Sequence, residues 1–106
     1  MGYRKYRNQK CECDGFTFDS KREMYRYQEL KLLEKAGEID DVRLQVSFEL
    51  IPANDDYRAI KYVADFTYCE NGKRIVEDVK GFKTKEYQLK KKLMRHVYGI
   101  KIREIQ

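Results

Sequence analysis

The stretch YVADFTYCENGKRIVEDVKG, residues 62–81, predicts a β-hairpin that carries two acids and a lysine on one face. Its centre is Asn71-Gly72, which lies between two runs of apolar and aromatic residues, 60–69 and 73–80. A two-residue type I′ turn needs positive φ at both central positions, and Asn followed by Gly meets that need best. The pair therefore predicts both the turn and the register of the two strands.

Counting outward from this turn places Asp65 directly opposite Asp78. Asp78 and Lys80 share a face because side chains alternate along a strand, and opposed residues also share a face. The Cβ atoms of the two acids are expected roughly 4.5–5.5 Å apart. The hairpin thus predicts a cluster of Asp65, Asp78 and Lys80.

Two opposed carboxylates need an offsetting interaction. At about 4 Å they repel by around 4 kcal/mol at an effective dielectric near 20, whereas a whole small domain is stable by only about 5–15 kcal/mol. A proton, the ammonium of Lys80 or a divalent cation can supply the offset, and oxygen ligands favour Mg²⁺ or Mn²⁺ over zinc. The alternative is a solvated face on which Lys80 is a salt-bridge partner.

Length and composition predict a single domain over residues 1–106. The chain has room for a modest core, and its net charge of +5 with a pI near 9.1 favours a polyanionic partner. No apolar run approaches the ~18 residues of a membrane span, and the N-terminus is polar and basic, so a cytoplasmic protein is expected. Its three cysteines are expected to be reduced thiols, because zinc partners for Cys11 and Cys13 are scarce.

Residues 1–10 are basic and contain no acid. Arg4 and Arg7 belong either to a solvated tail or to an arm that reaches nucleic-acid phosphates, and the two interpretations are compatible. The next ten residues predict a second small hairpin around Asp14-Gly15.

Residues 20–37 predict the first helix. Ser20 and Glu23 match a capping box, and Gly37 is a suitable stop. At 100° per residue, Glu23 projects into the middle of the apolar stripe that holds Tyr27 and Leu30. Glu23 is therefore either a helix cap, which its spacing from Ser20 favours, or a third carboxylate of the site.

Residues 42–50 alternate between apolar and polar and predict a strand, with Gln45 on its polar side. A second helix is predicted from a Thr84 cap to about Tyr98, followed by a final strand over 100–105 that pairs in parallel with 73–80. Lys90 falls in the apolar arc of this helix. It either snorkels to the rim or aims its ammonium at the acids or a phosphate.

Together these elements predict an α/β fold with a mixed four-stranded sheet (αβββαβ), flanked by two helices and preceded by a β-hairpin. The ordered set of motifs resembles the PD-(D/E)XK, or restriction-endonuclease-like, nuclease superfamily. More narrowly it is similar to a phage-encoded endonuclease family long described as of unknown function. The resembling segments are DGFTFDSKRE (14–23), AGEIDDVRLQVSFEL (36–50), YVADFTY (62–68), VEDVKG (76–81) and TKEYQLKKKL (84–93).

The resemblance implies a role for each matching residue. Asp65 and Asp78 would ligate Mg²⁺ or Mn²⁺, and Lys80 would orient the attacking water or stabilise transition-state charge. Glu23 would match an acid that many members carry on the first helix. The sequence has Ala64 where the nominal motif has Pro, which removes no ligand. Glu77 is excluded, because parity places it opposite Phe66 on the other face.

The implied function is metal-dependent hydrolysis of DNA by an endonuclease, with branched or junction DNA and a homodimer expected. The alternative is a non-catalytic nucleic-acid-binding domain on the same fold. If phage-encoded, the protein would act in the host cytoplasm. Residues expected to hold or position the DNA backbone are Lys90, Gln45, Lys83, Lys85, Lys91, Arg4 and Arg7.

Overall fold

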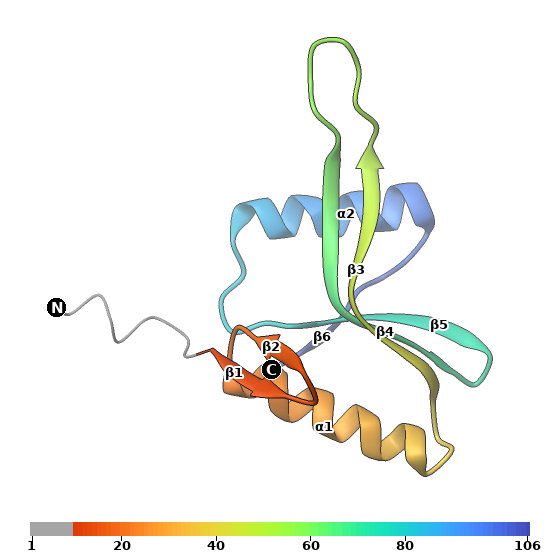
Figure 1. The fold of residues 1–106 in the computed structure, drawn as a ribbon. Coiled ribbons are helices and arrows are strands. Elements are labelled where there is room, and N and C mark those ends of the chain that lie inside the picture. The colour runs from red at the N-terminus through yellow and green to blue at the C-terminus, as the bar shows by residue number, and fades with distance from the viewer. Residues whose placement is uncertain (1–9) are drawn as a thin grey trace, which may run out of the picture.

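The computed structural model describes residues 10–106, which form two helices, a small two-stranded sheet and a four-stranded sheet (Figure 1). In chain order the elements are β1 (Cys11–Cys13), β2 (Phe16–Phe18), α1 (Lys21–Lys35), β3 (Asp40–Ile51), β4 (Ile60–Glu70), β5 (Lys73–Val79), α2 (Lys85–Tyr98) and β6 (Arg103–Ile105). The main sheet has the order β3-β4-β5-β6, with β6 parallel to β5 and the other neighbours antiparallel. The predicted fold class is confirmed.

Local sequence chemistry explains where the helices begin and end. The Ser20 hydroxyl accepts a 3.1 Å hydrogen bond from the Glu23 N–H, and Thr84 accepts one of 3.0 Å from the Tyr87 N–H. Both are the side-chain caps that free N–H groups at a helix start require. Gly99 ends α2 with a φ of 72°, a left-handed conformation that glycine adopts without strain.

The central hairpin also forms as predicted. Asn71 and Gly72 have φ values of 51° and 77°, and the ladder runs from Glu70↔Lys73 to Phe66↔Glu77. This is the register counted from the turn.

Residues 42–50 form the predicted strand, within β3, but the strand does not keep one face along its length. Its alternating apolar residues do not share a face, because Val42 and Leu44 pack with the α1 core while Phe48 and Leu50 pack with the α2 core. Between the two pairs lies Gln45, whose φ of 52° interrupts the strand geometry. A non-glycine residue at positive φ breaks the regular pleat, so the residues on either side face opposite ways.

Strand β4 changes sides at the matching point. Tyr62 and Ala64 belong to the α2 core, whereas Phe66 and Tyr68 belong to the α1 core. The residue between them is Asp65, and the ladder with β3 has no pair there, passing from Leu44↔Phe66 to Val46↔Ala64. The two strands therefore switch faces together.

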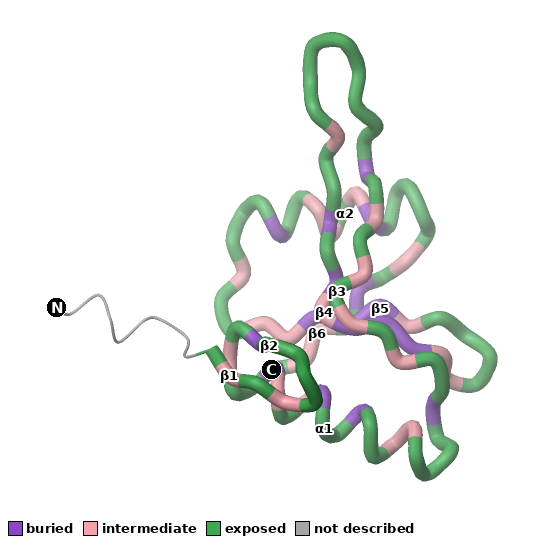
Figure 2. Tube along the Cα trace, in the orientation of Figure 1, coloured by how far each residue is buried: buried purple, intermediate pink, exposed green. Residues whose placement is uncertain are grey.

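One core lies between the sheet and α2, and the other lies between the sheet and α1. Figure 2 shows buried segments on the strands and on both helices. Beyond them the β3–β4 hairpin projects past α2 with an exposed tip. The described residues span 47 × 45 × 23 Å. No helix in this part of the chain is long and apolar enough to span a membrane.

Candidate functional site

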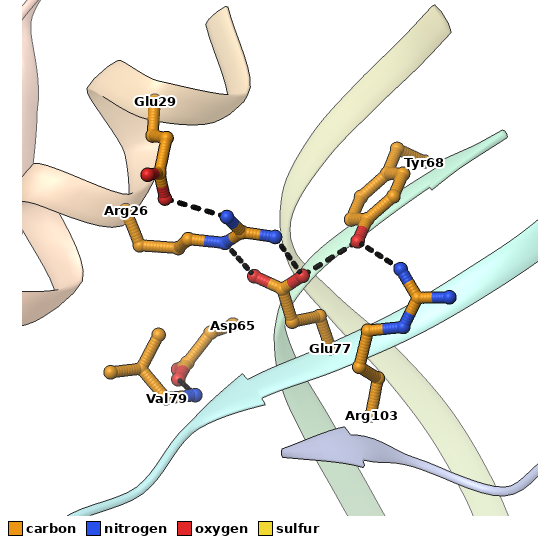
Figure 3. Close-up of polar contacts among 7 residues, drawn as sticks. All are labelled: Arg26, Glu29, Asp65, Tyr68, Glu77, Val79 and Arg103. Atoms are coloured by element: carbon orange, nitrogen blue, oxygen red, sulfur yellow. Dashed lines mark hydrogen bonds and ion pairs between the residues drawn. The ribbon is translucent and has the colours of Figure 1, made fainter. Parts of the chain in front are cut away.

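Asp65 and Asp78 come together on neighbouring strands, as predicted. Their carboxyl groups lie within hydrogen-bonding reach of each other. The backbone N–H of Val79 donates a 2.8 Å hydrogen bond to Asp65 Oδ2 (Figure 3), and the Tyr62 hydroxyl donates one of 2.6 Å to Asp78 Oδ2. Asp78 is only 2% exposed. Each acid is therefore held by a separate donor.

The same burial changes the acidity of both groups. The pKa of Asp65 is raised to about 6, chiefly by loss of solvent and also by the nearby Glu23, while the contacts with Asp78 and with the Val79 N–H oppose the rise. Loss of solvent raises the pKa of Asp78 to about 7, with Asp65 adding to the rise while Tyr62 and Lys80 oppose it. Burial and mutual proximity therefore make both carboxyl groups harder to ionise than an exposed aspartate.

Lys80 lies beside this pair. Its Nζ is 3.6 Å from Asp78 Oδ2 and 4.2 Å from the centroid of the Tyr87 ring on α2. The Tyr87 hydroxyl in turn donates a 2.7 Å hydrogen bond to Glu104 Oε2. The ammonium is therefore placed between a carboxylate and an aromatic face, which is a favourable position for a cation.

Glu23 makes contacts at the start of α1 and beside the acidic pair. Its backbone N–H is capped by Ser20, but its carboxylate accepts a 3.4 Å hydrogen bond from the Asp19 N–H. That carboxylate also lies within hydrogen-bonding reach of Asp65, and the residue is 7% exposed. Its side chain is thus directed at the acidic pair.

A divalent cation fits the chemistry of this pair. Within residues 10–106, no group of three or more His, Cys, Asp or Glu side chains is arranged to hold a metal ion. Mg²⁺, however, is usually bound by one or two carboxylates, with waters and substrate phosphates completing its octahedron. Asp65 and Asp78 are two neighbouring carboxyl groups whose mutual repulsion a cation would relieve.

Two predicted residues have other roles. Gln45 is exposed and serves as the point where β3 changes faces, opposite Asp65. Lys90 Nζ lies 3.5 Å from Glu86 Oε2 one turn earlier on α2, so it forms a surface ion pair and has no ion pair with the acids. The structure favours the snorkelling alternative for Lys90.

The basic residues predicted to grip DNA divide into three groups. Lys83 and Lys91 both contact Glu104, at 3.0 and 3.2 Å. Lys85 is exposed at the start of α2. Arg4 and Arg7 lie outside the described residues.

Sequence reasoning missed the partners that position the site. No role in the site was predicted for Tyr62, Tyr87 or Glu104. A pairing count for the parallel strand could have found Glu104, because it lies opposite Asp78 in the β5–β6 register.

The expected placement of Glu77 opposite Phe66, on the other face from Asp78, is confirmed, and Figure 3 shows the donors that surround its carboxylate. It pairs with Phe66 and faces α1, where Arg26 donates two hydrogen bonds to its carboxylate, at 2.7 and 2.8 Å. Tyr68 donates a third, and Arg103 contacts Tyr68. Glu77 is 0% exposed, so these donors compensate a fully buried charge.

Fold and site together define a small mixed-sheet α/β domain with a buried pair of aspartates beside a lysine. A family model described as "Protein of unknown function (DUF1064)" matches residues 3–105, and the chain belongs to that family. No curated protein and no solved structure matches the chain.

Proposed function

We propose that this protein is a magnesium-dependent endonuclease that hydrolyses DNA phosphodiester bonds, as its resemblance to the PD-(D/E)XK nucleases implies. The observation that carries the proposal is the contact between the Asp65 and Asp78 carboxyl groups with Lys80 beside them. Two acids and a lysine in this arrangement offer a place for a cation and a positive charge for a phosphate.

Each side chain has a distinct task in this proposal. Asp65 and Asp78 would hold Mg²⁺ or Mn²⁺, which when bound polarises the phosphate and makes a bound water more acidic. In the hydrolysis a water oxygen would bond to phosphorus as a P–O ester bond breaks; the water would release a proton to solvent, and the leaving oxygen would take one up. The Lys80 ammonium stabilises the charge that grows on the phosphate oxygens. Tyr62 fixes Asp78, and Glu23 positions Asp65.

The proposed substrate is DNA because the chain is basic and the site suits a phosphodiester. We favour branched or junction DNA bound by a homodimer, as in phage DNA processing. The second candidate is a non-catalytic nucleic-acid-binding domain. The net charge of +5, which suits binding of a polyanion whether or not it is cleaved, favours that candidate.

Cleavage assays separate the two. Wild-type protein, Lys80→Ala and the exposed control Lys73→Ala are incubated with linear, nicked and four-way-junction DNA, with and without Mg²⁺. We expect cleavage only with Mg²⁺, a loss of about 10²–10³-fold for Lys80→Ala and no change for Lys73→Ala. Equal activity of Lys80→Ala and wild type would remove the nuclease proposal.

A thermal-shift titration supplies an independent readout. Bound Mg²⁺ should stabilise the fold by about 1.4 kcal/mol at ten times its Kd, through ligand linkage. Asp78→Asn should abolish that gain. DNA binding with neither cleavage nor a magnesium-dependent shift would support the non-catalytic candidate.

A further inference from the structure

A pocket on the α2 side of the molecule is lined almost entirely by cations. Its volume is about 620 Å³, and its lining residues are Lys83, Gln88, Lys91, Lys92, Arg95 and Lys101. Five of the six carry a positive charge, and none is acidic. Cations at such close quarters repel one another, so the pocket suits a ligand with several negative charges.

Internal contacts neutralise only part of this charge. Glu104 is shared by Lys83 and Lys91, so one carboxylate serves two ammonium groups. Arg95 donates to the neutral carbonyl of Gly99. Within the described residues, Lys92 and Lys101 have no ion-pair partner, and both are exposed.

The pocket is connected to the candidate site through two side chains. Glu104 accepts a hydrogen bond from Tyr87, and the ammonium of Lys80 lies over the face of the Tyr87 ring. Lys83 also lies three residues after Lys80, on the segment that joins β5 to α2. Glu104, which contacts two of the pocket lysines, also lies opposite Asp78 in the β5–β6 register, so the pocket adjoins the candidate site.

We propose that this pocket binds backbone phosphates of the same nucleic acid whose scissile phosphate lies at Asp65 and Asp78. The choice of nucleic acid rests on the proposed function. Several cations around one hollow suit successive phosphates better than a single small anion, because a duplex carries one charge per ~1.7 Å of its axis. Lys92 and Lys101, which have no ion-pair partner among residues 10–106, are the residues that contact these phosphates.

Charge reversal at those two lysines tests the proposal. Lys92→Glu/Lys101→Glu is compared with Lys35→Glu/Lys73→Glu, which makes the same change of net charge at the end of α1 and at the β4–β5 turn, away from α2 (Figure 1). Binding of fluorescent duplex and four-way-junction DNA is measured by anisotropy in EDTA, between 50 and 200 mM salt. Binding of inorganic phosphate and of phosphatidylserine vesicles is measured with the same variants, to test whether the pocket takes a free anion or a membrane surface instead of DNA.

We expect the pocket variant to lose at least tenfold in DNA affinity. The slope of log affinity against log salt concentration should become shallower by about 2, since each phosphate contact contributes about 0.9. The control should change less than threefold, and thermal unfolding should show both variants folded. Equal losses in the two variants, or pocket-dependent binding of free phosphate or vesicles without DNA, would overturn the proposal. Binding in EDTA does not depend on catalysis. DNA binding through the pocket without any cleavage would therefore refute the nuclease proposal and leave the pocket proposal standing.

Discussion

The ammonium of Lys80 rests on the face of Tyr87, with its Nζ 4.2 Å from the ring centroid and 3.6 Å from Asp78 Oδ2. The lysine comes from the segment after β5 and the tyrosine from the first turn of α2. The packing of α2 on the sheet thereby fixes the position of the Lys80 ammonium, which the β4–β5 hairpin alone would leave at the end of a flexible side chain.

Substitutions of Tyr87 test this placement. Tyr87→Phe keeps the ring and loses only the hydrogen bond to Glu104, so DNA cleavage should stay within about threefold of wild type. Tyr87→Leu removes the aromatic face, and a desolvated cation–π contact is worth about 2 kcal/mol, so cleavage should fall by about tenfold or more. Equal cleavage rates for the leucine and phenylalanine variants would show that the ring does not position Lys80.

The acidic pair predicts a specific dependence of stability on pH in metal-free protein. The pKa values of Asp65 and Asp78, about 6 and about 7, lie above their ordinary value of 3.8, so the folded state binds more protons than the unfolded state. Their contribution is fully present below pH 4 and is lost as pH rises towards 7. Urea unfolding in EDTA should therefore show a free energy of unfolding that falls between pH 5 and 7.5.

The matched variant for that measurement is Asp65→Asn/Asp78→Asn, which has nearly the same shape and binds no proton. Its free energy of unfolding should vary less over the same pH range, and it should exceed that of wild type at pH 7.5. A slope as steep as that of wild type would place the titration elsewhere in the molecule.

Tyr62→Phe should make Asp78 a poorer ligand at neutral pH. The Tyr62 hydroxyl lowers the pKa of Asp78 through a 2.6 Å hydrogen bond, so its removal should raise that pKa further. Magnesium must then displace a more firmly bound proton. The thermal shift produced by Mg²⁺ should shrink at pH 7 and recover at pH 8.5, whereas wild type should change less between the two. A shift that is equally small at both values would instead indicate a damaged site.

The buried ion pair on the α1 side should matter for folding. Arg26→Met leaves the carboxylate of Glu77 buried without a cation and should cost about 3–5 kcal/mol in urea unfolding. Adding Glu77→Gln to that variant should recover part of the loss, because the uncompensated charge is gone. Arg74→Met, which breaks an exposed pair with Asp41, is the control and should cost much less. Equal costs for Arg26→Met and Arg74→Met would contradict the prediction.

Local signals allowed much of this site to be predicted. The Asn71-Gly72 turn gave the register that brings Asp65 to Asp78, and helical periodicity put Glu23 on the inward face of α1. Both follow from backbone geometry within a few residues, where turn type and side-chain direction leave few alternatives.

Contacts between distant segments could not be predicted in the same way. Periodicity marks Tyr62 and Tyr87 as apolar, yet each uses its polar end, one on Asp78 and the other on Glu104. Whether a tyrosine in the core has a carboxylate within reach depends on how helix and sheet dock. The same is true of Glu77, whose burial depends on Arg26, a residue that comes 51 positions earlier.

The sequence by itself determined the elements, their caps, the hairpin register and the meeting of two aspartates, because each of these depends on dihedral preferences and on counting along one strand. Only the tertiary structure decided that β3 and β4 change faces at Gln45 and Asp65. Two helices on opposite sides each need an apolar surface from the same strands. The strands supply both by reversing there, so that Tyr62 and Ala64 pack towards α2 while Phe66 and Tyr68 pack towards α1.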